Sequence, residues 1–204
     1  MKYILDKDMK FITINSLNFV ALTDLPTPDL MSEFVKLNIQ WPDGNQICLN
    51  TVVGYESDYE FGCGSLSWDW ANQYAEIDED GSERIIVPKR PDPYQEDDFN
   101  ILCTQFVGTL FEDVYKALDQ RYHLGRVRLM RSMSRSCLSW HIDDHPRVHY
   151  PIKTQEGCLM VIENESYQLP NNTWWWTNTL LNHTAVNASM EDRIHLVATI
   201  VGVK

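Results

Sequence analysis

The stretch "RIHLVATIVGV" (193–203) decides the fold, because it reads as one β-strand with two chemically different faces. Successive side chains of a strand point to opposite sides. One side carries polar groups with a single valine among them: Arg193, His195, Val197 and Thr199. The other side is entirely apolar: Ile194, Leu196, Ala198 and Ile200. The sequence therefore predicts a strand that packs on a core with one face and lines a polar interior with the other.

Three further stretches after Gly125 also read as strands. "RVRLMRSM" (126–133) alternates, "GCLMVIE" (157–163) is a short apolar run, and "NTWWWTNTLL" (172–181) is rich in aromatic and β-branched residues. No helical pattern separates them. Short strands without intervening helices predict an antiparallel sandwich or barrel. The absence of a glycine-rich nucleotide-binding loop agrees with this prediction.

The segment 102–123 has helical periodicity. Apolar residues recur every three or four positions, at Phe106, Leu110, Val114 and Leu118, and Gly125 is expected to end the helix. An apolar stripe of this kind predicts a purely structural helix that covers one face of a sheet.

The length suits a single domain, residues 1–204. Residues 76–99 combine acidic residues with Gly81 and three prolines, and they are expected to form a long exposed loop or connection. This segment separates an N-terminal part, residues 1–100, from a strand-rich core, residues 101–204.

Composition and charge argue against several classes of protein. The formal net charge of −12 argues against a nucleic-acid partner, because phosphate binding needs a surface rich in lysine and arginine. No run of 18 apolar residues occurs, so no membrane span is expected. Charges from Lys2 to Lys10 interrupt the start of the chain, so no secretory signal is expected. Five scattered cysteines indicate reduced thiols, and a cytoplasmic protein is expected.

The stretch "SWHIDDHPRVHYPIKT" (139–154) holds the candidate chemistry. His141 and Asp143 are two positions apart, so they project to the same side of an extended chain. A second histidine would complete the 2-His-1-carboxylate triad that holds non-haem iron(II), and His183 follows the aromatic strand within "NHTAVN" (182–187). Arg147 and His149 alternate in the same way and also aim polar groups to one side.

Arg193 opens the terminal strand on its polar face. A guanidinium that points inward is costly unless it meets an anion. Its planar fork fits a carboxylate in bidentate fashion, so the sequence predicts an anionic partner for this residue.

Besides an iron(II) site with an anionic partner, parts of the pattern fit two other functions. His141 and His145 have the H-x-x-x-H spacing of a zinc hydrolase, although Pro146 disfavours a helix there and Ile142 stands where such a helix would carry a glutamate. A cupin-like metal-binding protein without oxygenase activity would leave Arg193 without an anionic co-substrate.

The combined pattern resembles a known family over residues 125–202. H-x-D is followed by R-x-H-x-P, then by N-H-x-x-x-N, with an arginine ten residues after the histidine of this last motif. This order is similar to the aspartyl/asparaginyl β-hydroxylase-like branch of the iron(II)/2-oxoglutarate-dependent oxygenases, to which the free-proline hydroxylases also belong. The resemblance implies a mainly β, double-stranded β-helix (jelly-roll, cupin-like) fold with an N-terminal mixed region and a supporting α-helix.

By this resemblance, the protein is expected to be a dioxygenase that hydroxylates an unactivated C–H bond with iron(II), 2-oxoglutarate and molecular oxygen. The implied catalytic residues and metal ligands are His141, Asp143 and His183. The residues implied at the co-substrate are Arg193, Arg147 and His149. The substrate is expected to be a free amino acid, a protein or peptide side chain, or a related small metabolite. Residues 1–100 carry no part of the resemblance and are expected to shape the substrate site.

Overall fold

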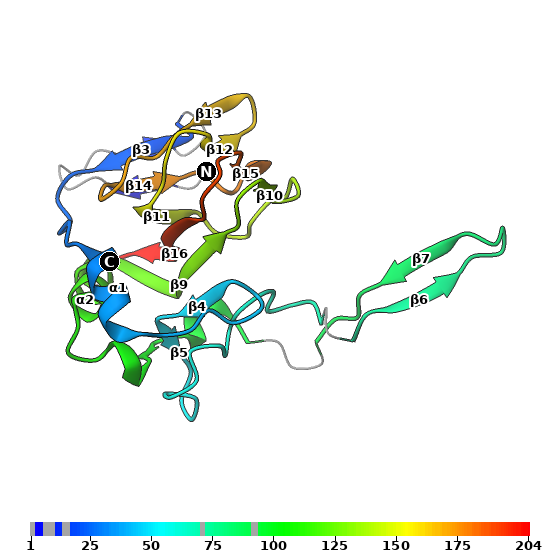
Figure 1. Ribbon diagram of the computed structural model, residues 1–204, viewed down its shortest axis with the longest axis horizontal. Helices are drawn as coiled ribbons and strands as arrows, with labels where there is room; N and C mark the ends of the chain where they lie inside the picture. The colour runs from blue at the N-terminus through cyan, green and yellow to red at the C-terminus, as the bar shows by residue number, and fades with distance from the viewer. Residues whose placement is uncertain (1–2, 6–10, 14–16, 70–71, 91–93) are drawn as a thin grey trace.

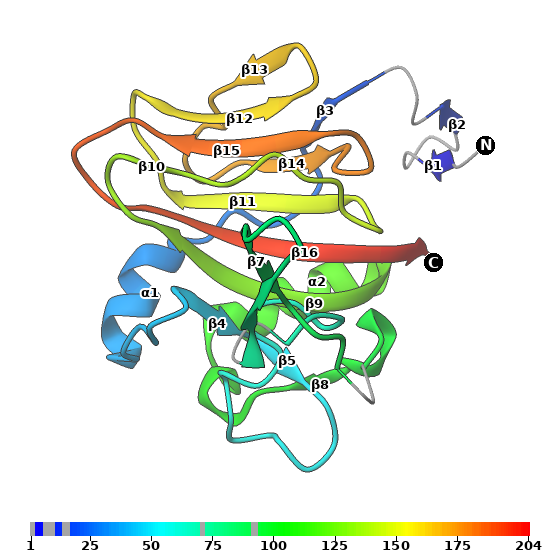
Figure 2. The same cartoon turned by 90° about the vertical axis from the view of Figure 1, so that its right-hand side faces the viewer.

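Eight strands of the C-terminal half wind back and forth between two facing sheets. The computed structural model describes residues 3–5, 11–13, 17–69, 72–90 and 94–204. The strands of the larger sheet are β9 (Tyr122–Ser132), β11 (Arg147–Lys153), β14 (Trp174–Thr177) and β16 (Arg193–Val203). Those of the smaller sheet are β10 (Ser136–Cys137), β12 (Cys158–Ile162), β13 (Glu165–Tyr167) and β15 (His183–Asn187). In Figure 2 the strands of both sheets run across the view, with β13 and β12 toward the top and β16 and β9 below them.

The order of the strands defines a jelly roll. The larger sheet has the order β3-β14-β11-β16-β9-β4, and the smaller sheet has the order β10-β15-β12-β13. All of the pairings are antiparallel. The chain crosses between the sheets after β9, β10, β11, β13, β14 and β15, which is the winding of a double-stranded β-helix. The fold predicted from the sequence is confirmed.

The N-terminal part extends the larger sheet at both edges. β3 (Phe19–Leu22) pairs with β14, and β4 (Gln46–Cys48) pairs with β9. Between them, α1 (Leu30–Leu37) begins at Asp29, whose carboxylate accepts a hydrogen bond from the backbone N–H of Ser32. The remaining short elements are β1 (Tyr3–Leu5), β2 (Phe11–Thr13), β5 (Asn50–Thr51), β8 (Ile101–Leu102), η3 (Glu96–Asp98) and η4 (Thr104–Phe106).

The supporting helix is shorter than the sequence predicted. α2 spans Leu110–Arg121, and Thr109 caps it with a hydroxyl that accepts from the N–H of Phe111. The prediction of a helix from 102 to 123 was wrong at its start, where β8 and η4 lie. Gly125 does not end it either, because β9 begins at Tyr122 and Gly125 lies inside that strand.

The two faces of the larger sheet have different chemistry. One face packs against α1 and α2, and its fully or nearly buried side chains belong to the same apolar cluster as Leu118 of α2: Val127, Leu129, Val148, Tyr150, Leu196 and Ala198. Trp174 and Trp176 join this cluster, whereas Trp175 packs with Met160 and Ile162 between the sheets. The other face points toward the smaller sheet, and it carries the polar residues described below.

A β-hairpin projects from the body of the molecule, as Figure 1 shows. β6 (Tyr74–Ile77) pairs with β7 (Glu83–Ile86), so this part of the expected loop is an exposed two-stranded ribbon. Arg84 pairs with Glu76 across the ribbon, with 3.0 Å between Nη2 and Oε2. No helix among the described residues is long and apolar enough to cross a bilayer.

Candidate active site

His141 and His183 face each other across two chain segments that lie side by side. The N–H of His141 donates to the carbonyl of His183 at 3.0 Å, and the N–H of His183 donates to the carbonyl of His141 at 2.9 Å. This isolated bridge lies at the start of β15. Their rings lie 4.2 Å apart, centroid to centroid. The backbone therefore fixes the separation of two imidazoles that are 42 positions apart in the sequence.

Both imidazoles are oriented by the same local hydrogen bond. Nδ1 of His141 lies 2.7 Å from the carbonyl of Ser139, and Nδ1 of His183 lies 2.9 Å from the carbonyl of Leu181. A carbonyl only accepts, so each Nδ1 carries the proton and each Nε2 keeps a free lone pair. Burial lowers the pKa of His183, which favours the neutral ring that binds a metal.

Asp143 supplies the carboxylate. Its N–H donates to the carbonyl of Thr179, which holds the segment against the loop before β15. Oδ2 of Asp143 lies 2.9 Å from Nε of Arg147 and 3.7 Å from Nε2 of His183. Burial opposes ionisation, but the hydrogen bond and charge of Arg147 outweigh it and lower the pKa of Asp143. The carboxylate is therefore ionised at neutral pH.

The three residues predicted as metal ligands come together. One ligand atom from each of His141, Asp143 and His183 lies within 4.8 Å of the others. This is the only such group found among the residues that the structure describes, and His145 is not part of it. A pair of imidazoles with a carboxylate on one side fits iron(II) and leaves coordination positions open for other ligands.

Arg193 is buried on the inward face of β16. Its Nε donates to Nε2 of His195 at 2.9 Å. A second guanidinium nitrogen, Nη2, lies 3.1 Å from Nδ1 of His195, and the same Nδ1 lies 3.5 Å from Nδ1 of His149. Burial, followed by the charges of Arg193 and Arg147, lowers the pKa of His149 to about 3, so the ring is neutral.

Two buried nitrogen atoms remain without a hydrogen-bond partner. Nε2 of His149 and Nη1 of Arg193 are buried and make no hydrogen bond to any described residue. Burial also lowers the pKa of Arg193 to about 10. Buried donors in a folded protein are normally paired. An anion with two carboxylates, such as 2-oxoglutarate, is the kind of ligand that these two groups fit.

A charged network that the sequence analysis did not predict borders the metal-ligand group. Nη2 of Arg126 lies 2.8 Å from Oε1 of Glu96, and Nη1 of Arg147 lies 3.7 Å from the same atom. Arg147 also donates to the hydroxyl of Thr199. Burial would raise the pKa of Glu96, but Arg126 and Arg147 outweigh it and lower the pKa to about 2. The alternation in 126–133 could have predicted that Arg126 points to the polar side of its strand, whereas no pattern in the sequence near Glu96 indicated that this residue reaches the site.

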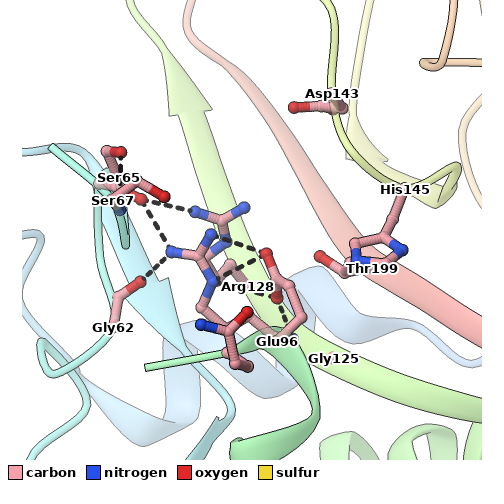
Figure 3. A network of polar contacts seen from close by, with 12 residues as sticks. Gly62, Ser65, Ser67, Glu96, Gly125, Arg128, Asp143, His145 and Thr199 are labelled. Carbon is pink, nitrogen blue, oxygen red and sulfur yellow. Dashed lines mark hydrogen bonds and ion pairs between the residues drawn. The ribbon is translucent and has the colours of Figure 1, made fainter. Parts of the chain in front are cut away.

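Gly125 makes room for this network. A Cβ atom at this position would lie 2.7 Å from both Cβ and Oε2 of Glu96. The missing side chain lets the carboxylate approach β9 closely enough for Oε2 to accept from the N–H of Arg126 at 2.8 Å. Figure 3 shows Glu96 beside Gly125, with Asp143, His145 and Thr199 on one side of it and the Gly62–Ser67 loop on the other.

Asn187, the last residue of the N-H-x-x-x-N motif, has a structural role. Its side-chain nitrogen donates to three backbone carbonyls, those of Ser132, Met133 and Glu191. Its Oδ1 accepts from the N–H of Ser189 at 3.2 Å. The residue is fully buried and joins the end of β15 to the turns on either side of it.

Comparison with known proteins identifies the family. Residues 95–201, just over half of the chain, match the family described as aspartyl/asparaginyl beta-hydroxylase. The chain therefore belongs to this family. It is an iron(II)- and 2-oxoglutarate-dependent hydroxylase, as the sequence predicted. The zinc hydrolase and the cupin-like protein without oxygenase activity are not favoured.

Solved structures with low sequence identity also match. An oxidoreductase of the 2OG-Fe(II) oxygenase family from Burkholderia pseudomallei has 11% identity over 91% of this chain and 86% of its own, with a TM-score of 0.47. IDO from Bacillus thuringiensis has 13% identity over 95% of this chain and 97% of its own, with a TM-score of 0.45. A cupin domain from Bordetella pertussis has 18% identity over 39% of this chain and 81% of its own, with a TM-score of 0.34.

Proposed function

We propose that His141, Asp143 and His183 hold the iron(II) and that Arg193, His149 and Arg147 hold 2-oxoglutarate. The bound metal and co-substrate supply, with molecular oxygen, the oxidising chemistry that hydroxylates an unactivated C–H bond. The substrate is proposed to be a free amino acid, a peptide or protein side chain, or a related small metabolite. The observation that carries the co-substrate assignment is the pair of buried nitrogen atoms without hydrogen-bond partners, Nε2 of His149 and Nη1 of Arg193.

The residues of the chain contribute position and charge. The carbonyls of Ser139 and Leu181 orient the two imidazoles so that each presents Nε2. Arg147 donates to Oδ2 of Asp143 and so holds the carboxylate beside the two imidazoles. His195 orients Arg193 through its Nε, which leaves Nη1 for a carboxylate. A site in which every ligand is oriented before binding loses little free energy to rearrangement.

The N-terminal part is proposed to shape the substrate site. Gln46, Gly62 and Gly64 all contact arginines of β9 that face the interior. A cytoplasmic location is also part of the proposal, because the five cysteines are free and unpaired thiols are typical of reducing compartments. The acidic net charge supports a partner other than nucleic acid.

Titration of 2-oxoglutarate into the anaerobic iron(II) protein tests the proposed function. A metal-to-ligand charge-transfer absorbance is expected to appear and to saturate at one equivalent of 2-oxoglutarate. Succinate should form when oxygen is then admitted. The titration is repeated with zinc in place of iron, where the same protein should bind the metal but show no such band. Absence of the band with iron(II) would contradict the proposal.

A further inference from the structure

Arg128 on β9 is a buried guanidinium without a carboxylate partner. Only 6% of its surface is exposed. Nη1 donates to Oε1 of Gln46 at 3.0 Å and to the carbonyl of Gly64 at 3.4 Å. Nε has no acceptor, and no ion pair joins this arginine to any described residue. Arg126, two positions away, is by contrast fully engaged with Glu96.

The surroundings of Arg128 are unfavourable for a positive charge. Burial, followed by the neighbouring guanidiniums of Arg126 and Arg147, lowers the pKa of Arg128 to about 10. The two acceptors that it has are neutral oxygens. A buried cation with only neutral acceptors costs free energy unless an anion binds beside it.

Arg128 points into the same interior as the proposed co-substrate site. It is paired with Val197 of β16, which is paired in turn with His149 of β11. Residues directly opposite in neighbouring strands project from the same face, and the two strand spacings amount to about 10 Å. Figure 3 shows Arg128 between the Gly62–Ser67 loop and the Asp143–His145 segment.

The charge balance of this interior leaves room for one more anion. Four arginines face it: Arg126, Arg128, Arg147 and Arg193. Their ion pairs within the described chain use only two carboxylates, Glu96 and Asp143. Four guanidiniums against two carboxylates leave an excess of two positive charges. Iron(II) and 2-oxoglutarate carry equal and opposite charges, so their joint binding does not remove this excess. Since Arg193 is assigned to 2-oxoglutarate, the guanidinium that still lacks an anion beside it is the one at Arg128.

We propose that Arg128 binds a carboxylate of the primary substrate, which makes the preferred substrate a small carboxylic acid such as a free amino acid or the C-terminal residue of a peptide. The Nε–Nη2 edge of the guanidinium is available for this, because the described contacts of Arg128 all use Nη1. That edge matches a carboxylate in bidentate fashion. The inference rests on the proposed function, because it takes the metal and co-substrate to be bound nearby.

Calorimetric titration of the anaerobic iron(II)–2-oxoglutarate protein tests this inference. The ligands are free amino acids, dipeptides with a free C-terminus and aliphatic carboxylic acids, each compared with its own primary amide. Some acids are expected to bind, and the matching amides should bind at least tenfold more weakly. This comparison uses the unaltered protein, so it does not depend on the folding of a variant.

Variants of Arg128 then locate the carboxylate. Arg128→Met should weaken binding of the best acid ten- to a hundredfold and should bind the acid and its amide equally. Arg128→Lys should keep a preference for the acid with reduced affinity. Arg84→Met, on the exposed hairpin, is the matched control and should behave as the wild type. Charge-transfer titration should give an unchanged 2-oxoglutarate affinity in all three variants.

The outcomes separate this inference from the proposed function. Loss of the 2-oxoglutarate band in the wild type would contradict the proposed function itself. With the band present, the assignment of Arg128 is wrong if no acid binds, if amides bind as tightly as acids, or if Arg128→Met keeps the acid preference. A lowered thermal stability with unchanged acid binding would mean that Arg128 only anchors the loop at Gly64.

Discussion

Two buried nitrogen atoms give the clearest residue-scale evidence for a co-substrate site. Nε2 of His149 and Nη1 of Arg193 make no hydrogen bond within the described chain. A buried polar group that lacks a partner costs about 1–3 kcal/mol. Binding of a dicarboxylate would remove this cost, so the site is built to be more favourable when it is filled.

Arg193→Lys is expected to weaken 2-oxoglutarate binding while iron(II) binding stays largely intact. Lysine keeps the positive charge but loses the planar fork, including the Nε contact to His195. The charge-transfer titration should give a dissociation constant raised at least tenfold. Equal affinity in the variant and the wild type would contradict the role of Arg193.

His183→Ala is expected to abolish tight iron(II) binding. The substitution removes one of the three ligand atoms that lie within 4.8 Å of one another. His145→Ala is the matched control, because His145 is close in sequence but is not part of the group. Equilibrium dialysis with iron(II) under argon measures both. Retained affinity in His183→Ala with lost affinity in His145→Ala would reverse the ligand assignment.

Glu96 should make the stability depend on pH at the acid end. Its pKa of about 2 in the folded protein lies below the usual value of about 4.3. The carboxylate therefore stabilises the fold fully above roughly pH 4.3, and this contribution is lost as the pH falls toward about 2. Because one pKa unit corresponds to about 1.4 kcal/mol, the loss is on the order of 3 kcal/mol.

Glu96→Gln should flatten this dependence. Urea unfolding of the variant is expected to give a lower free energy of unfolding at neutral pH and a smaller decrease between about pH 5 and pH 3. Glu79→Gln, at an exposed position of the hairpin, is the control and should follow the wild type. If the free energy of unfolding of Glu96→Gln decreased at low pH as much as that of the wild type, the ion pairs of Glu96 with Arg126 and Arg147 would not be the source of the pH dependence.

At the scale of elements, α2 packs against the apolar face of the larger sheet. Leu118 is fully buried against the apolar face of the larger sheet, while Leu110 is only partly buried. The predicted stripe was therefore correct at Phe106, Val114 and Leu118, which are fully buried, and weaker at Leu110. Phe111, which is fully buried, was missed, although it lies three positions before Val114 and so on the same helix face, whereas Phe106 is buried from η4 and not from α2.

Leu118→Ala is expected to lower the free energy of unfolding by about 2–5 kcal/mol, because it leaves a cavity in the core. Val107→Ala, at a position that is 58% exposed, should change it by less than about 0.5 kcal/mol. Urea unfolding measures both variants. Iron(II) and 2-oxoglutarate binding should be unchanged in folded Leu118→Ala. A stable variant that loses turnover would contradict a purely structural helix.

For the whole molecule, local patterns predicted an antiparallel sandwich or barrel and brought His141 beside Asp143, whereas the jelly roll and the complete metal-ligand group were implied by the family resemblance. Alternation in 193–203 placed Arg193 and His195 on one face, and H-x-D placed His141 beside Asp143. Glu96 could not be predicted in the same way. It reaches the site from a segment that the sequence marks only as acidic, through a close approach to Gly125 that depends on the assembled fold.

The projecting hairpin should be separable from the rest of the fold. The side chains of β6 are all exposed, and those of β7 are nearly all exposed. Replacement of residues 74–86 by a Gly-Ser turn is expected to leave Tm within about 2 °C of the wild type, a shift that corresponds to less than about 1 kcal/mol for a chain of this size. Thermal unfolding and the 2-oxoglutarate titration check this. A large decrease in Tm would mean that the hairpin packs on the body in solution.

The alternation of apolar and polar residues in β9, β11 and β16 means that packing of the apolar core also fixes the orientation of the polar side chains of the site. Val127, Val148 and Ala198 pair in one row, and the arginines and histidines occupy the positions between such rows. A slip of one residue in any of these strands would turn the guanidiniums of that strand toward the helices and its aliphatic side chains toward the iron ligands. Hydrophobic burial therefore disfavours a misaligned strand whether or not a metal is bound. An insertion or deletion of a single residue between Arg193 and Ala198, before the irregularities at the end of β16, is expected to abolish activity even if no catalytic side chain is altered.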